Sequence, residues 1–272
     1  MVIKVSSRCL DLGRVMILPQ RKIQGLSFKL SRKDSSTMER LGKFLSRAGA
    51  QCILLFFETI KEPRGIIYID YTESKLKPLE ILELALKEFP EIEDYQCIEP
   101  QHQGLLIDTA SFPITVAGER VILVRQTGIQ GLIRKLKQEL GASAAEALLY
   151  NLGVEMGQGL AETHLKLANK LSITDPKEIL EKISVPLFTT LGYGELHIKE
   201  FKINPQPDIL LHIHECIEAT AQESTSKPAC HLVRGIIERG TSTIFKMPLQ
   251  AIETKCKAQG YPYCELKLIP QQ

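Results

Sequence analysis

The first hundred residues carry two alternating hydrophobic patterns. Apolar and polar residues in strict alternation are typical of a half-buried strand, whereas apolar residues three or four positions apart are typical of an amphipathic helix. The patterns predict, in order, a strand at 22–31, a helix at 38–50, strands at 51–60 and 65–73, a helix at 78–89 and a strand at 91–99. This βαββαβ order predicts a ferredoxin-like fold, in which both helices pack on one face of an antiparallel sheet.

The remainder of the chain predicts a helical region followed by strands. Residues 99–124 read as a linker and then a strand pair, with Val121 to Val124 as a buried run. A long helical segment begins at Gly128, and we expect Gly141 to divide it into two helices. The second of these helices contains small residues that would let another element approach its backbone closely. They are Gly153, Gly157, Gly159 and Ala161.

A shorter helix and two paired strands follow this region. Asp175 has the side chain of an N-cap, and Pro176 suits the first helical position. Residues 191–203 and 208–219 have the pattern of two paired strands. We therefore expect an α+β protein: an N-terminal ferredoxin-like domain and a C-terminal domain of helices on an antiparallel sheet.

Composition narrows the class of protein. The chain has 272 residues, 44% hydrophobic and 24% charged, which is ordinary for a globular protein with one large or two modest domains. A net charge of +2 gives no electrostatic reason to expect direct binding of nucleic acid. No stretch approaches the about 20 apolar residues of a membrane helix, and the N-terminus lacks an apolar signal core. We therefore expect a cytoplasmic protein, whose clustered thiols are metal ligands before they are disulfides.

Motifs of common enzyme classes are missing from the sequence. Gly192 and Gly194 resemble the start of a dinucleotide fingerprint, but His197 occupies the place of its third glycine and a strand follows. There is no phosphate-binding loop, no Gly-x-Ser-x-Gly elbow and no His-Glu-x-x-His pair. The sequence therefore favours a binding protein over an enzyme.

One strand combines two histidines and a cysteine. His212, His214 and Cys216 point to one side of the strand, and Ile209, Leu211 and Ile213 point to the other. The polar side would line a ligand or metal pocket, or it would form a half-exposed strand face.

The clearest candidate chemistry lies at the end of the chain, in residues 253–264, ETKCKAQGYPYC. Residues 248–260 predict a helix, which would place Glu253 and Cys256 on one face. Pro262 turns the chain, and Cys264 begins the last strand, so its thiol can reach the same point. With Cys230 upstream, these residues supply three thiolates and one carboxylate, a four-coordinate set that suits structural zinc. The alternative is a group of reduced, buried cysteines beside a surface glutamate.

The run from Cys230 to Cys264 resembles the 4-vinyl-reductase domain, also called the hydrocarbon-binding domain. That domain has a cysteine, a Gly-containing helix, Glu-x-x-Cys, a short turn and a last cysteine before its closing strand. The resemblance extends over about residues 115–270. It implies zinc at Cys230, Glu253, Cys256 and Cys264, beside an apolar pocket between helices and an antiparallel sheet. Relatives bind phenols, other small hydrocarbons or tetrapyrrole precursors.

The N-terminal pattern at about residues 21–99 resembles an ACT domain, a small regulatory fold that often binds amino acids and pairs with itself. The alternative is a dimerisation or packing module. We expect an ACT-like regulatory or dimerisation domain at 1–105 and a 4-vinyl-reductase-type domain at 106–272. Both modules commonly pair, which implies a homodimer.

Together, these features predict a small-molecule sensor that holds an apolar or aromatic ligand beside a structural zinc. The alternative is an enzyme or accessory protein of vinyl-tetrapyrrole metabolism. Strand phase suggests the polar groups that would orient a ligand. These candidates are Tyr193, His197, His212 and His214.

Overall fold

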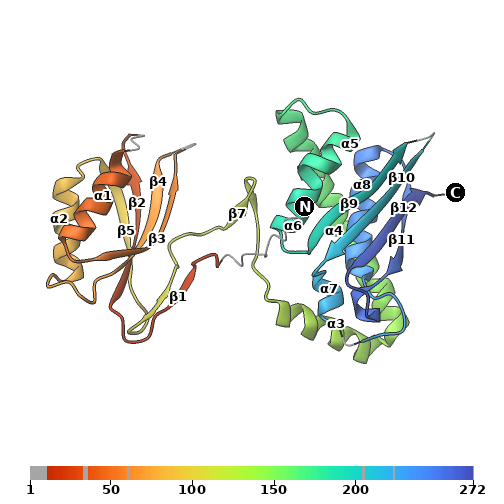
Figure 1. Ribbon diagram of the computed structural model, residues 1–272, viewed down its shortest axis with the longest axis horizontal. Coiled ribbons are helices and arrows are strands. Elements are labelled where there is room, and N and C mark those ends of the chain that lie inside the picture. Colours follow the sequence, from red (N-terminus) through yellow and green to blue (C-terminus); the bar gives the residue numbers. More distant parts are fainter. Residues whose placement is uncertain (1–10, 33–35, 60–61, 204–205, 223, 272) are drawn as a thin grey trace, which may run out of the picture. The chain divides into compact units, whose positions relative to one another are not determined.

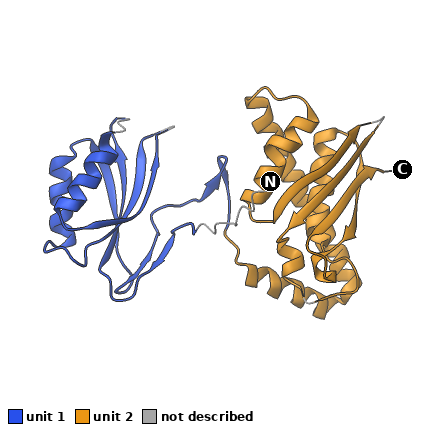
Figure 2. Cartoon of the chain, in the orientation of Figure 1, with its two compact units in different colours: residues 1–122 blue, residues 123–272 orange. Residues whose placement is uncertain are grey.

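The computed structural model consists of two compact units, residues 1–122 and 123–272 (Figure 2). It describes residues 11–32, 36–59, 62–203, 206–222 and 224–271. The first unit continues past residue 105, because β6 (Leu105–Ile107) pairs with β1 (Val15–Ile17) of the same unit. None of the helices in the described part of the chain combines the length and apolar composition needed to cross a bilayer.

The first unit has the predicted βαββαβ order. Its elements are β2 (Ile23–Leu30), α1 (Ser36–Arg47), β3 (Gln51–Glu58), β4 (Arg64–Asp70), α2 (Pro78–Glu88) and β5 (Ile92–Ile98). The sheet is antiparallel with strand order β3-β4-β2-β5, and both helices cover one face (Figure 1). Phe28, Phe44 and Ile67 are buried between the helices and the sheet. On the opposite face, β1 and β6 cover a smaller core that contains Tyr68 and Leu106.

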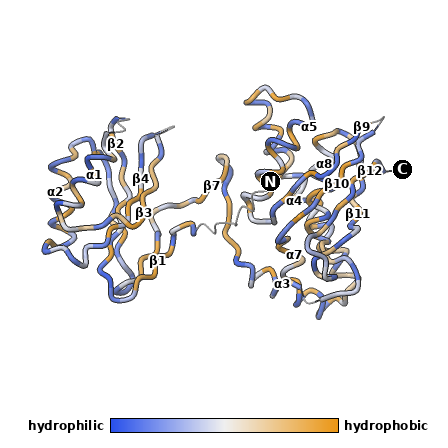
Figure 3. The backbone as a smooth tube through the Cα atoms, viewed as in Figure 1, coloured by the Kyte–Doolittle hydropathy of each residue, from blue (hydrophilic) through white to orange (hydrophobic). Residues whose placement is uncertain are grey.

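The second unit is a layer of helices on a second antiparallel sheet. Its helices are α3 (Gln126–Leu140), α4 (Ala142–Lys170), α5 (Pro176–Ile179), a π-helical turn (Leu180–Ser184), α6 (Val185–Thr190), α7 (Ile217–Thr220) and α8 (His231–Phe245). Its strands are β9 (Glu195–Ile203), β10 (Pro207–His214), β11 (Leu249–Lys255) and β12 (Cys264–Pro270), in the order β11-β12-β10-β9. Hydrophobic and hydrophilic positions alternate along the elements of both units (Figure 3).

Several local predictions for the second unit are confirmed. Gly141 separates α3 from α4, with the positive φ of 76° that glycine tolerates. The Asp175 side chain accepts a hydrogen bond from the Lys177 backbone at 3.1 Å and so caps α5. The strands predicted at 191–203 and 208–219 pair as β9 and β10.

Two other predictions are wrong. Residues 121–124 are not a buried strand: a hairpin of β7 (Thr115–Val116) and β8 (Glu119–Arg120) precedes them, and Ile122 is 77% exposed. Residues 248–260 are not a helix, because Leu249–Lys255 form strand β11 and only Lys257–Gln259 form a 3₁₀ turn. Alternating burial of Leu249 and Ala251 against β12 outweighs the helical spacing.

Helices α4 and α8 are in unusually close contact because each has glycine at the crossing. A Cβ atom on Gly153 would lie 2.1 Å from the Leu232 carbonyl oxygen, and one on Gly235 would lie 2.3 Å from the Tyr150 carbonyl oxygen. The predicted close approach is thus confirmed at Gly153. At Gly159, by contrast, a Cβ would meet nothing within 4 Å.

We expect Gly153→Ala to destabilise the second unit by about 1–3 kcal/mol, because the added methyl group would push α8 away from α4. Gly159→Ala in the same helix is the matched control, and we expect it to stabilise by up to about 1 kcal/mol through helix propensity. Urea unfolding monitored by circular dichroism measures both. Equal effects of the two substitutions would contradict the close approach.

Candidate metal centre and buried cavity

Four potential metal ligands converge from separate segments of the second unit. Cys230 immediately precedes α8, Glu253 lies on β11, Cys256 follows β11, and Cys264 begins β12. One ligand atom from each residue lies within 4.8 Å of all the others. The three cysteines are fully buried and Glu253 is half-buried. The predicted set is therefore brought together in space.

The distances between the sulfur atoms fit a tetrahedral metal ion. The Sγ atom of Cys230 lies 3.5 Å from that of Cys264 and 3.8 Å from that of Cys256, and the remaining pair is 3.9 Å apart. Zinc bound tetrahedrally at a Zn–S distance of about 2.3 Å separates its sulfurs by about 3.8 Å. The three thiols therefore already have nearly the spacing of such an ion's ligands.

Glu253 has one carboxylate oxygen to spare for a cation. Its Oε2 accepts a hydrogen bond from the Cys230 backbone at 3.0 Å, whereas its buried Oε1 has no partner among the described residues. Burial raises the pKa of Glu253 to about 8, with a smaller contribution from Cys256 in the same direction. A divalent cation would both satisfy the free oxygen and offset the cost of burying the charge.

A β-bulge explains how a strand can present Glu253 and Cys256 to the same point. In a regular strand, residues three apart point to opposite faces. The pairing of β11 with β12 shifts between Glu253 and Lys255, which adds one residue to that side of the ladder. Bulges of this kind redirect side chains. The added residue returns Cys256 to the side of Glu253, the outcome that the predicted helix was meant to explain.

Cys264 is fixed by the turn that precedes it. The Lys257 backbone donates a hydrogen bond to the Cys264 sulfur at 3.3 Å. Gly260 adopts a φ of 94°, which closes the 3₁₀ turn and returns the chain towards β12.

A buried glutamate that the sequence analysis missed positions Cys230. The carboxylate of Glu218, on α7, is fully buried and accepts hydrogen bonds from the backbones of Leu232 at 3.1 Å and Val233 at 3.0 Å. These donors belong to the first turn of α8, which would otherwise be unsatisfied. Burial raises the pKa of Glu218 to about 7. Only the tertiary structure shows this cap, because Glu218 and α8 are separated by a loop.

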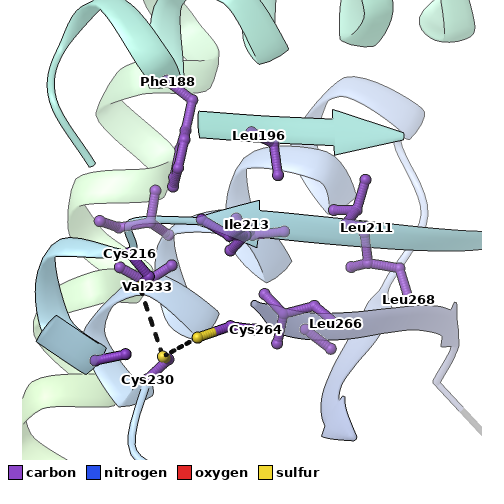
Figure 4. Packing of buried hydrophobic residues seen from close by; sticks show 14 of the residues in the cluster. Phe188, Leu196, Leu211, Ile213, Cys216, Cys230, Val233, Cys264, Leu266 and Leu268 are labelled. Atoms are coloured by element: carbon purple, nitrogen blue, oxygen red, sulfur yellow. Dashed lines mark hydrogen bonds between the residues drawn. The ribbon is translucent and has the colours of Figure 1, made fainter. Parts of the chain in front are cut away.

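A further sulfur lies beside the metal-ligand set. The Sγ atom of Cys216 is fully buried and lies 3.5 Å from that of Cys230 (Figure 4). The strand ends at His214, and Glu215 has a positive φ of 49°, so Cys216 leaves the strand register predicted for it. Cys216 thus lies in the core, away from the two histidines.

A small apolar cavity lies between the helices and the sheet of the same unit. Its volume is about 40 Å³, which is space for roughly three water molecules. Leu196 of β9 and Leu211 of β10 form its floor, and residues of α4, α6 and α8 form its walls. Its polar lining consists of His164, Ser184 and Thr241.

His164 and Ser184 form a hydrogen-bonded pair at this cavity. The Ser184 hydroxyl lies 3.0 Å from Nδ1 of His164. Burial lowers the pKa of His164 to about 4, so its ring is neutral at pH 7. Ser184 ends the π-helical turn, an irregularity that often marks functional sites. Neutral histidine can both donate and accept a hydrogen bond, which suits recognition of a hydroxyl group.

The residues predicted to orient a ligand do not line this cavity. Because Leu196 and Leu211 face it, His197 and His212 lie on the opposite face of the sheet. His212 bonds Glu265 at 2.8 Å and stacks on Tyr263, with ring centroids 4.0 Å apart.

The other two predicted residues are also accounted for by local contacts. His214 packs edge-on against His197, with ring centroids 5.6 Å apart. Tyr193 contacts Phe188, whose ring does line the cavity, at 5.2 Å between centroids. The predicted strand phase is confirmed, but the helices cover the apolar side of the sheet, so the cavity lies on that side.

This fold places the second unit among known small-molecule sensory domains. It is similar to the phenol-responsive sensory domain of the transcription activator PoxR, solved with phenol, with a TM-score of 0.52 and 21% sequence identity. The match covers 56% of this chain and 77% of that domain.

The sequence comparison defines the type of domain. Residues 209–270 match the model of the 4-vinyl-reductase domain family, so the second unit contains a domain of this type. The uncharacterized protein MJ0150 of Methanocaldococcus jannaschii is 27% identical over 120 residues, which are 44% of this chain and 62% of that relative, less than two thirds of its length. A solved vinyl-4-reductase family protein from the same organism is 22% identical with a TM-score of 0.37, covering 57% of this chain and 85% of that one.

The buried His164 makes stability depend on pH. Its pKa is lowered from 6.5 to about 4 in the folded state, so below pH 6.5 the unfolded chain takes up the proton first. This contribution is fully present above pH 6.5 and is lost as the pH falls towards 4, amounting to roughly 3 kcal/mol.

We expect His164→Leu to remove this part of the acid destabilisation, as measured by urea unfolding between pH 7 and pH 4. His197→Leu, on the outer face of the sheet, is the control and should keep the wild-type pH dependence. An unchanged pH dependence in His164→Leu would contradict the assignment.

Proposed function

We propose that this protein is a small-molecule sensor whose second unit binds a small aromatic or apolar ligand in the His164 cavity, beside a structural zinc. The observation that carries this proposal is the pairing of a neutral, buried histidine with an otherwise apolar cavity. The PoxR domain, which shares the fold, responds to phenol and was solved with it. A ligand of that kind presents an apolar ring and one hydroxyl group.

Zinc is the metal that best suits the four donors. Thiolate ligands favour a borderline-soft ion, and the nearly tetrahedral spacing of the sulfurs favours zinc over metals that prefer oxygen. Four protein ligands leave no open position, which is typical of a structural site. The ion would join the start of α8 to the β11–β12 hairpin, and these elements also bound the core in which the cavity lies.

We expect the purified protein to contain one zinc per chain, and Cys256→Ser to lose it. Because the free energy of metal binding is also free energy of folding, the variant should unfold at markedly lower temperature. Elemental analysis and calorimetry of the full chain measure both effects. Cys52→Ser, an exposed cysteine of the first unit, is the control and should retain the metal. Wild-type stability in a strong chelator would contradict a structural zinc.

The size of the cavity implies that binding is coupled to a movement. A ring the size of phenol does not fit in about 40 Å³ unless the surrounding side chains separate. A ligand would therefore select a more open arrangement of the α4, α6 and α8 walls, and this change would carry the signal to the rest of the molecule.

We expect phenol to raise the melting temperature of the protein and to bind more tightly than toluene, which lacks the hydroxyl group. His164→Leu should weaken phenol binding by about tenfold while leaving toluene binding nearly unchanged, because it removes only the hydrogen bond. Isothermal titration calorimetry measures the affinities, with His197→Leu as control. Equal affinities of the His164→Leu and wild-type proteins for phenol would refute this binding site.

The two-domain assignment also remains a proposal, with a 4-vinyl-reductase-type domain at 106–272 and an ACT-like regulatory or dimerisation domain at 1–105. The βαββαβ topology of the first unit supports the latter. Dimerisation is supported by an exposed apolar stripe at helical spacing on α4, formed by Leu148, Leu152 and Met156. The alternative role in vinyl-tetrapyrrole metabolism gains no support from a cavity of about 40 Å³.

A further inference from the structure

The first unit contains a cavity of ligand size that the proposed function does not use. It has a volume of about 430 Å³ and opens between α1 and α2, above one end of the sheet. Binding sites for small molecules typically measure about 300–1,000 Å³. The His164 cavity of the second unit, at about 40 Å³, is roughly tenfold smaller. The present conformation therefore offers more room for a small molecule in the first unit than in the His164 cavity.

The interior of this cavity is hydrophobic. Phe44 of α1, Ile67 of β4 and Ile81 of α2 are nearly fully buried at its base. Leu41 and Leu82 line its walls from the two helices. Cavity surface of this kind is stabilised by an apolar ligand, since contact with the ligand replaces contact with water.

The rim of the cavity carries polar groups of different kinds. Lys77, immediately before α2, and Tyr71, immediately after β4, both line it, together with Gln24 and Glu99. Lys77 forms no ion pair with any residue that the structure describes, and within the same residues the Tyr71 hydroxyl has no hydrogen-bond partner. Lys77 also precedes the first turn of α2, whose positive end of the helix dipole favours an anion.

Tyr71 is suited to donate a hydrogen bond at this rim. Burial, and then the negative charge of Glu99, raise the pKa of Tyr71 above its ordinary value. The hydroxyl is therefore protonated at neutral pH. A ligand head group that accepts hydrogen bonds and carries one negative charge can be bound by this hydroxyl and by the Lys77 ammonium group.

We propose that this cavity is a second small-molecule site, which binds a monocarboxylate with an apolar body: the hydrocarbon lies between α1 and α2, and the carboxylate is bound by Lys77 and Tyr71. Glu99, on the same rim, opposes a second negative charge and so disfavours dicarboxylates. The proposal concerns the first unit alone and does not rest on the function proposed for the second.

The test uses the full-length protein and two matched probes, octanoate and 1-octanol. Isothermal titration calorimetry should show that octanoate binds about fivefold more tightly, because only the carboxylate interacts with the exposed Lys77. Lys77→Gln should remove this preference and leave 1-octanol binding unchanged. Lys87→Gln, at the other end of α2 and outside the cavity lining, is the matched control and should behave as wild type.

Two further variants locate the site. Ala85→Phe should abolish binding of both probes by filling the cavity, and Ala85→Met serves the same purpose if the larger residue prevents folding. Glu99→Gln should strengthen octanoate binding about twofold to fivefold by removing a like charge from the rim. His164→Leu, in the second unit, should leave octanoate binding unchanged.

Three outcomes would overturn the proposal: no binding of either probe, equal affinity for octanoate and 1-octanol in the wild type, or octanoate binding that survives both substitutions of Ala85. None of them bears on phenol binding at His164, so the two sites can fail independently.

Discussion

The structure of the second unit depends on the convergence of Cys230, Glu253, Cys256 and Cys264 on one point. These residues belong to elements that local sequence interactions do not join: the start of α8 and the two strands of the terminal hairpin. Three buried thiols and a half-buried carboxylate would be a costly core without a cation, because burial disfavours their charged forms. The donor spacing and the free oxygen of Glu253 both fit a cation that reverses this cost.

The surrounding structure supports this arrangement. Glu218 satisfies the first backbone donors of α8 and thereby fixes the position of Cys230. Gly153 and Gly235 allow α8 to pack directly on α4, which holds the other side of the same helix. The His164 cavity lies between these helices and the sheet, so its shape is set by the same packing. A ligand that separates the cavity walls would act against these contacts, which gives a physical route from binding to conformational change.

The two units present their candidate sites in different ways. The His164 cavity is small, enclosed by helices and contains one neutral hydrogen-bonding pair. The cavity of the first unit is larger and has charged groups of both signs at its rim. The first favours an uncharged ligand that presents a hydroxyl group, and the second favours an apolar ligand with an ionised head. If both sites are occupied, the protein would respond to two chemically distinct molecules.

Periodicity alone determined much of the fold, because a pattern of spacing is a local property of the chain. The βαββαβ order of the first unit, the break at Gly141 and the alternation along β9 and β10 are all readable in this way. The four candidate metal ligands were also identifiable, since their residue types and spacing resemble a known domain. What the sequence could not show is which partner each element would have in three dimensions.

Only the tertiary structure decided three features. Residues 249–255 are a strand because β12 pairs with them, and the bulge after Glu253 restores the shared direction that a helix had been predicted to provide. His197 and His212 lie outside the cavity because the helices cover the apolar face of the sheet. His164 and Glu218 escaped notice because a single polar residue in a helix carries no periodic signal. Its role depends on the distant residues that bury it.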